Sequence, residues 1–520
     1  MDEIDNDSWE SDPTTSDGDE AGIADSLVPA SDPDYRIKLP PLRNPNVAQA
    51  VLLAGTLAQL GLALLITIYL ARVLTAADFG FFSLVGTIFI LARKFLDLGL
   101  SNVAARDIAA DARRERPILE GMMAYRRVAG LVLALMLCIF ALMQRSAPER
   151  AVLLAVGWVL LFTEPAALDP VFQVRQAQGA PALLNALGGL LVLGGSVAFK
   201  RLGLAGAAFA WLLIVRESVT LVGTKLLAER LLGYRPRPGF RERGLKAFVG
   251  PALIFGLASL VYTIYFHCDV FFVYALRGKD ELGAYAAAFR PINPLLLLPW
   301  LLMVPLVPVL TVAARDRERF VTQVRELCGL AAGLGACGLV AGVLLARDLV
   351  SLLYRGRYLA GPLSCVNAFR WLAVALGLVC VTTVLTAAML ADRREKMLLA
   401  IGTAALVVNA AMNLVLLDIY NFTAAGFATA ATELLFLVGA LAAFHSVTGK
   451  SAVTRASAPY LLPAMLMGVV LYFVGGGPAT RVAAGVALGL LSVAAILSSD
   501  RARRFRKEMA ADDISPMVVM

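Results

Sequence analysis

The residues that most often carry enzymatic chemistry are scarce in this sequence. Among 520 residues there are two His, His267 and His445, and six Cys without any Cys-x-x-Cys pair. Zinc sites and nucleophile–His–acid triads depend on imidazole, so this shortage disfavours a His-based metal site or triad. A Gly-x-x-x-x-Gly-Lys-Ser/Thr sequence is also missing, which argues against ATP hydrolysis by the chain. We therefore expect no catalytic residue, no metal and no cofactor.

Charged residues are scarce as well, at 17% of the chain, whereas hydrophobic residues make up 59%. A soluble domain is roughly 45–50% apolar. Apolar runs of about 20 residues, the length that crosses a bilayer, can be placed fourteen times. They cover residues 47–71, 80–104, 121–143, 151–172, 180–199, 204–227, 247–275, 284–312, 327–346, 366–391, 397–417, 423–444, 458–475 and 479–498. The sequence predicts an all-α polytopic membrane protein with about 14 transmembrane helices.

The basic residues are distributed unevenly along the chain. Most of the 47 Lys and Arg lie in the N-terminal tail or in every second connection between apolar runs. Because cytoplasmic loops collect Lys and Arg, both termini are predicted to be cytoplasmic. The densest clusters, at 106–127, 235–246 and 501–507, lie at the ends of apolar runs. They therefore indicate membrane orientation and not nucleic-acid binding.

The first part of the N-terminal tail is acidic. Its first 34 residues hold twelve Asp or Glu and no Lys or Arg, a composition typical of a disordered segment. It lacks the basic start and the continuous apolar core of a signal peptide, so no cleavage is expected.

A short cassette occurs twice at matching places. Asp78-Phe79-Gly80-Phe81-Phe82 precedes one apolar run and Glu281-Leu282-Gly283-Ala284-Tyr285 precedes another, and both runs end in Val-Ala-Ala-Arg-Asp. We interpret each cassette as a short turn, and the repeat as two pseudo-symmetric six-helix bundles. The predicted domains are a disordered acidic cytoplasmic tail (1–43), an N-terminal six-helix bundle (44–232), a basic cytoplasmic linker (233–246), a C-terminal six-helix bundle (247–446), two extra transmembrane helices (447–499) and a basic cytoplasmic tail (500–520).

Four segments of the chain are similar to a known family. LARVLTAADFGFFS at 70–83, DLGLS at 97–101, GAYAAAFR at 283–290 and YRGRY at 354–358 resemble polysaccharide biosynthesis proteins. These are the Wzx-type oligosaccharide flippases of the multidrug/oligosaccharidyl-lipid/polysaccharide exporter superfamily. The resemblance covers about 44 to 446 and implies flipping of a polyprenyl-diphosphate-linked oligosaccharide across the bacterial inner membrane, by alternating access. The product would be surface polysaccharide: O-antigen of lipopolysaccharide, capsule or exopolysaccharide. The expected partners are this lipid-linked oligosaccharide, membrane lipids and glycan assembly proteins, with the chain acting as a monomer.

Two other functions remain open from the sequence. One is a cation-coupled drug or metabolite exporter of the same superfamily, for which an acidic lumen is expected. The other is a membrane glycan polymerase, which the short connections predicted on the outer side disfavour.

Ionisable residues inside the apolar runs are the candidate site residues, because a charge in the bilayer costs several kcal/mol unless it is paired or hydrated. The substrate-binding candidates are Arg290, Arg93, Arg216, Arg370 and Lys94. The ion-coupling candidates are Asp97, Asp269 and Glu433.

Each of these candidates has a structural alternative. Lys94 and Asp97 are three residues apart, so a pair within one helix is the favoured alternative for them. Asp169 and Glu164 each precede a proline and are interpreted as turn residues. Asn409 and Asn413 fit either sugar binding or hydrogen bonding between helices.

Arg290 is the strongest candidate. It precedes Pro291 in a run that also contains Pro294, Pro299, Pro305 and Pro308, so we expect a broken or kinked helix at this place. Broken helices at bilayer depth line cavities in transporters, and a guanidinium can bind a diphosphate with two hydrogen bonds. The alternatives for Arg290 are a side chain that reaches the membrane surface and a pair with Asp269. The matching run of the first bundle is predicted to be unbroken.

Overall fold

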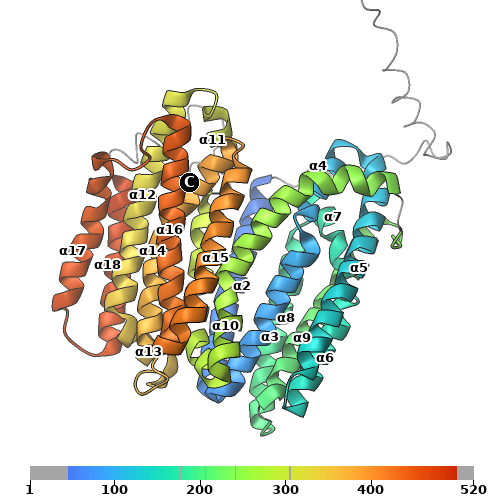
Figure 1. Cartoon of the computed structure of the whole chain (residues 1–520), viewed down its shortest axis with the longest axis horizontal. Helices are drawn as coiled ribbons and strands as arrows, with labels where there is room; N and C mark the ends of the chain where they lie inside the picture. The colour runs from blue at the N-terminus through green and yellow to red at the C-terminus, as the bar shows by residue number, and fades with distance from the viewer. Residues whose placement is uncertain (1–44, 176, 205, 240–241, 304–305, 500–520) are drawn as a thin grey trace, which may run out of the picture. The chain divides into compact units, whose positions relative to one another are not determined.

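The computed structural model describes residues 45–499, with gaps at 176, 205, 240–241 and 304–305. The regular secondary structure of the described residues is helical throughout (Figure 1). Both predicted tails, 1–43 and 500–520, lie outside the described residues.

Within the described residues, the first half of the chain forms eight α-helices, α2 to α9. They are α2 (Pro45–Val73), α3 (Ala76–Asp97), α4 (Leu100–Ala110), α5 (Glu115–Leu142), α6 (Ala147–Leu160), α7 (Asp169–Val174), α8 (Gly179–Arg201) and α9 (Trp211–Leu232). The second half follows with α10 (Glu242–Met303), α11 (Leu306–Ala313), α12 (Arg317–Leu344), α13 (Ala346–Tyr354), α14 (Val366–Ala391), α15 (Glu395–Tyr420), α16 (Thr423–Thr448), α17 (Leu462–Phe473) and α18 (Pro478–Ser498).

Ten of the described helices are long and apolar enough to cross a membrane. The bent pair of Ala147–Leu160 and Glu164–Val174 would make an eleventh, and Ala58–Val73 and Ser457–Phe473 are shorter apolar helices. The prediction of an all-α multi-pass membrane protein is confirmed. The count of fourteen and the domain boundaries stay predictions.

Helix α10 consists of two helical arms, because the chain folds back on itself at Gly278. The backbone there has φ 82° and ψ −173°, a conformation open to glycine. The Tyr285 hydroxyl donates to Asp269 at 2.9 Å, and the rings of His267 and Phe289 lie 5.8 Å apart. In a straight helix these pairs would be separated by about 24 and 33 Å. We call residues 242–277 the first arm of α10 and residues 279–303 its second arm.

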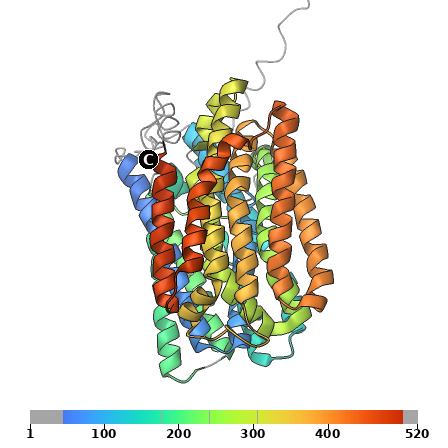
Figure 2. The same cartoon turned by 90° about the vertical axis from the view of Figure 1, so that its left-hand side faces the viewer.

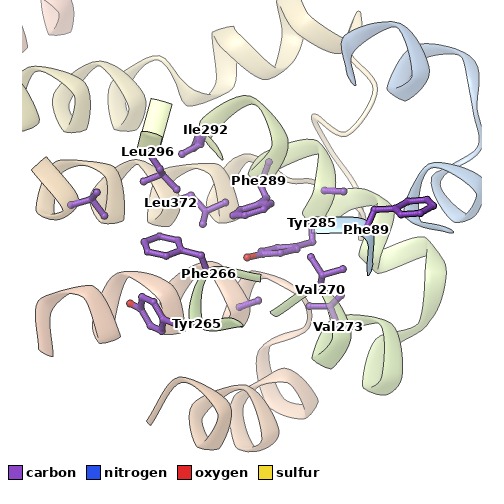
Figure 3. Close-up of a cluster of buried hydrophobic side chains, with 14 of the residues drawn as sticks. Phe89, Tyr265, Phe266, Val270, Val273, Tyr285, Phe289, Ile292, Leu296 and Leu372 are labelled. Carbon is purple, nitrogen blue, oxygen red and sulfur yellow. The ribbon is translucent and has the colours of Figure 1, made fainter. Parts of the chain in front are cut away.

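Apolar side chains fill the space between the two arms. Figure 3 shows Phe266 and Val270 of the first arm gathered with Tyr285 and Phe289 of the second. All four are buried, and the rings of Tyr285 and Phe289 stack 5.8 Å apart. The predicted span 247–275 and most of the predicted span 284–312 thus pack together as one helical hairpin.

The two copies of the repeated cassette contact each other where α3 packs along α10. A methyl group on Gly80 would lie 2.2 Å from the Lys279 carbonyl oxygen, and one on Gly283 would lie 1.9 Å from that of Ala76. The interpretation of the cassettes as turns is wrong, because both are helical, and Thr75 caps the start of α3 by accepting from the Asp78 amide at 3.1 Å. Glycine is needed here because it lets two helix backbones approach closely.

Substituting Gly283 by alanine is expected to destabilise the protein. The added methyl group would force α3 and α10 apart, and overpacking of this kind costs about 1–3 kcal/mol. Thermal unfolding in detergent micelles measures the effect. Gly194→Ala is the matched control, since a methyl group there meets open space. Equal unfolding temperatures for the two variants would contradict the tight contact.

A helix break that the sequence did not predict lies in the first half of the chain. Helix α3 ends at Asp97, Leu98 and Gly99 have φ of 39° and 74°, and α4 begins at Leu100. The prediction of an unbroken run at 80–104 is therefore wrong. A methyl group on Gly256 of α10 would lie 1.8 Å from the Leu98 carbonyl oxygen, so the break is packed against the second half.

At Arg290 itself the helix continues, whereas farther along the same run α10 ends at Met303 and α11 begins at Leu306. The second arm of α10 is helical through Pro291 and onward to Met303. Pro291 cannot donate to the carbonyl of Ala287, four residues earlier. The hydroxyl of Tyr354, which is 1% exposed, donates to this carbonyl at 2.7 Å and replaces the missing bond. A neighbouring side chain thus satisfies the helix, as membrane helices with proline require.

Helices α17 and α18 pack against α12 on one flank of the described residues (Figures 1 and 2). Tyr460 covers Gly329 of α12, where a methyl group would lie 2.7 Å from its ring. Arg481 at the start of α18 pairs with Asp348 of α13 at 2.8 Å. These contacts join the two extra helices to the second half.

Candidate functional site

Arg290 of α10 contacts α3 of the other half. Its Nε donates to the Ser83 hydroxyl at 3.0 Å and its Nη2 to the Ser83 carbonyl at 3.1 Å. The guanidinium carbon lies 5.6 Å from the centre of the Phe82 ring. Gly86 leaves room for the group, since a methyl group there would lie 2.9 Å from Nη2. In the described part of the chain Arg290 forms no ion pair, so neither Asp269 nor another acid neutralises it.

A second polar cluster lies within the first half. Arg93 of α3 binds Glu217 of α9 with two hydrogen bonds, that from Nε being 2.9 Å long. Asp97 at the end of α3 accepts from Arg126 of α5 at 3.1 Å and from Ser101. The pairs join three helices of this half and leave Arg93 compensated, because Glu217 carries the opposite charge.

The favoured Lys94–Asp97 pair is replaced by contacts to other helices. Lys94 donates to Ser259 of α10 at 3.3 Å, while Asp97 is bound to Arg126. The reason is burial: the Arg126 side chain is 5% exposed and needs an acid more than the exposed Lys94 does.

Two members of this cluster were missed from the sequence. Arg126 lies inside the predicted run 121–143 and also within the basic cluster at 106–127, which indicates membrane orientation. Asp169, interpreted as a turn residue, lies close enough for electrostatic interaction with Arg126, Asp97, Arg93 and Glu217. The position of Arg126 within an apolar run was the available signal for it.

Arg216 and Arg370 lie in different environments, one partly buried and one exposed. Arg216 lies close enough to interact electrostatically with Arg93 and Glu217, and its buried Nε has no hydrogen-bond partner among the described residues. Arg370 is exposed and donates to Asn367 in its own helix at 3.3 Å. The five cationic candidates thus differ in their partners: Arg93 is bound to an acid, whereas Lys94, Arg290 and Arg370 donate to uncharged groups.

Asp269 lies at the centre of a buried polar network in the second half. The side chain is 1% exposed and accepts hydrogen bonds from Tyr285 at 2.9 Å, Asn413 at 2.7 Å and Thr429 at 2.6 Å. Asn413 also donates to the Asn409 side chain at 2.9 Å. Both Asn residues therefore take part in bonding between or along helices, which is the structural one of their two predicted roles.

Glu433 of α16 is the second buried acid of this half. It is 1% exposed and lies beside Tyr265 and Thr382. Its Oε2 has no hydrogen-bond partner within the described residues. Within the same residues neither Glu433 nor Asp269 is paired with a Lys or Arg. An uncompensated buried carboxyl group can hold a proton or a small cation, because either one removes the cost of its charge.

Two further observations concern metal binding and cavities among the described residues. In the described residues no group of three or more His, Cys, Asp or Glu is placed to hold a metal ion. A cavity of about 430 Å³ opens among residues that include Asp78, Glu149 and Trp211, at the start of α3, α6 and α9. None of the candidate site residues lines this cavity.

The profile of a family described as polysaccharide biosynthesis protein matches residues 49–312, slightly more than half of the chain. The chain belongs to the polysaccharide biosynthesis protein family. The resemblance seen in residues 70–83 is thereby confirmed. No curated protein matches the chain by sequence.

Two solved structures share the fold of this polysaccharide biosynthesis protein. "Lipid II flippase MurJ, inward closed conformation" has a TM-score of 0.69 and 13% identity, covering 89% of this chain and 100% of that chain. An "inward-facing conformation of a multidrug resistance MATE family transporter of the MOP superfamily" has a TM-score of 0.53 and 16% identity, covering 75% and 94%. At these identities the likeness concerns the fold.

Proposed function

We propose that this polysaccharide biosynthesis protein flips a polyprenyl-diphosphate-linked oligosaccharide from the cytoplasmic to the outer leaflet of the bacterial inner membrane. The observation that carries the proposal is Arg290, a cation without an acidic partner among the described residues, on the arm of α10 that contacts α3. A guanidinium can bind a diphosphate with two parallel hydrogen bonds. The polyprenyl chain would remain in the lipid while the headgroup passes between the halves.

Alternating access fits the contacts between the two halves. They consist mainly of α3 against the two arms of α10, through close backbone approaches at Gly80, Gly283 and Gly256. The polar bonds between the halves are exposed or partly buried. Arg290–Ser83 and Lys94–Ser259 join α3 to α10, and Arg72, Arg357 and Lys279 make further bonds to the opposite half. Because water can reach such groups when the halves separate, parting them would leave few buried polar groups unpaired.

The driving ion would act at Asp269 and Glu433. Both are buried without a paired cation among the described residues, whereas Asp97 is engaged by Arg126. We therefore narrow the three ion-coupling candidates to these two acids of the second half. Both lie in a region joined by hydrogen bonds from α10, α15 and α16, so proton or cation binding there would act on three helices together.

Purified protein in liposomes is expected to carry a fluorescent undecaprenyl-diphosphate oligosaccharide across the bilayer. Loss of accessibility to an added membrane-impermeant quencher measures the transfer, and chromatography of the recovered lipid measures the glycan length. Transfer with unchanged length is the expected result. An extended glycan would favour a polymerase, and export of drugs without lipid transfer would favour a cation-coupled exporter.

A further inference from the structure

His267 on the first arm of α10 has one ring nitrogen bound and one unpaired. Its Nδ1 lies 3.1 Å from the Thr263 carbonyl oxygen. Because a carbonyl can only accept, Nδ1 carries the hydrogen, and Nε2 of the neutral ring is an acceptor. The residue is 8% exposed, and Nε2 is buried without a hydrogen-bond partner in the described part of the chain. A buried acceptor left unpaired costs about 1–3 kcal/mol, so a donor that reaches it would bind favourably.

The helical spacing directs this ring toward the contact between the halves. Gly256, Ser259, Thr263 and His267 follow one another at intervals of three and four residues and therefore share one face of the first arm. The first two of them contact the end of α3, through the Leu98 backbone and through Lys94. Asp269, two residues after His267, points the other way and binds α15 and α16.

His267 also lies near Arg290 of the second arm. Its ring packs edge to face against Phe289, the residue before Arg290, and Phe289 lies in the cluster shown in Figure 3. The two arms run side by side from the reversal at Gly278. His267 and Arg290 are nearly equally far from Gly278 along the chain, so they lie at similar positions on the two arms. Arg290 lies close enough to the His267 ring for electrostatic interaction. A cationic donor and a neutral acceptor thus stand together at the surface that contacts α3.

We infer that His267 accepts a hydrogen bond from the first sugar of the lipid-linked substrate, through a hydroxyl or acetamido N–H group, while Arg290 donates to the diphosphate. The inference rests on the proposed function and adds a residue that recognises the sugar. Phosphate oxygens are acceptors and cannot satisfy an acceptor nitrogen, whereas sugar hydroxyl and amide groups can. The first sugar is bonded directly to the diphosphate, so it is the part of the headgroup that would lie beside Arg290.

Binding of two lipids to the protein in nanodiscs tests the inference. The probes are undecaprenyl diphosphate and undecaprenyl diphosphate carrying one N-acetylglucosamine. His267→Phe keeps a ring against Phe289 but removes the acceptor, and it is expected to weaken binding of the glycosylated lipid about fivefold to tenfold while leaving the bare diphosphate unaffected. Arg290→Ala is expected to weaken binding of both lipids.

A second variant, His267→Gln, distinguishes loss of the hydrogen-bond acceptor from misfolding of the protein. His267→Gln retains an acceptor in its amide oxygen, so it is expected to keep more affinity for the glycosylated lipid than His267→Phe does. Equal effects of His267→Phe on both lipids, or no effect on either, would overturn the role of His267. Unchanged binding of both lipids by Arg290→Ala would instead count against the diphosphate site, and so against the proposed function itself.

Discussion

Replacing Arg290 by alanine is expected to lower transfer of the lipid-linked oligosaccharide by about 10- to 100-fold. A hydrogen-bonded charge pair with the diphosphate contributes about 1.5–3 kcal/mol, and alanine removes both the charge and the donors. Arg290→Lys is expected to fall between the wild type and Arg290→Ala, since an ammonium keeps the charge but cannot donate two parallel bonds from a planar group. The liposome transfer rate measures both variants.

Two controls separate substrate binding from structure. Arg347→Ala removes an exposed arginine at the start of α13, and transfer is expected to remain within twofold of the wild type, or about 0.4 kcal/mol. Ser83→Ala removes the hydroxyl that accepts from Arg290 but leaves the guanidinium in place. Should Ser83→Ala be as damaging as Arg290→Ala, the arginine would be a clamp between α3 and α10 and its role in diphosphate binding would be refuted.

Substituting Asp269 by asparagine is expected to abolish the stimulation of transfer by an ion gradient. Asparagine has nearly the same shape but cannot release a proton or neutralise a cation. Its side-chain oxygen still accepts from two of the three donors, Tyr285, Asn413 and Thr429, so the fold should persist at a modest cost of about 1 kcal/mol. Transfer into liposomes with and without an imposed proton or sodium gradient measures the stimulation, expected to drop at least about tenfold.

Glu433→Gln is expected to act in the same direction, and Asp418→Asn is the matched control. Asp418 is an exposed acid near the end of α15, outside the buried network. Its neutralisation should leave the gradient response intact. If both Asp269→Asn and Glu433→Gln were still accelerated by the gradient as the wild type is, the coupling site would have to lie elsewhere.

Much of the architecture follows from local sequence pattern. Apolar runs of bilayer length predict helices because a buried backbone must satisfy its own hydrogen bonds. The repeated cassette indicated related halves, and its glycines are where α3 and α10 meet. Its helical state could not be predicted, because glycine beside an acid reads equally as a turn and as a close helix contact.

The helix break illustrates the same limit. Five prolines predict a break within 290–308. The helix at Pro291 is continuous and is held by Tyr354, a residue 63 positions later. Farther along the run α10 ends at Met303 and α11 begins at Leu306, with 304–305 outside the described residues. The break at Leu98 and Gly99 carries no proline signal. Both outcomes depend on a neighbour that is distant in sequence.

The sequence by itself determined that this is a helical membrane protein of the polysaccharide biosynthesis family, because composition, run length and local motifs are properties of single segments. It also identified Arg290, Asp269 and Glu433 as charged residues within apolar runs. Only the tertiary structure decided which charges are compensated. Arg93 is paired with Glu217 and Asp97 with Arg126. Within the described residues, Arg290, Asp269 and Glu433 have no ion-pair partner. Pairing is decided by which helices pack together, and spacing along the chain does not encode it.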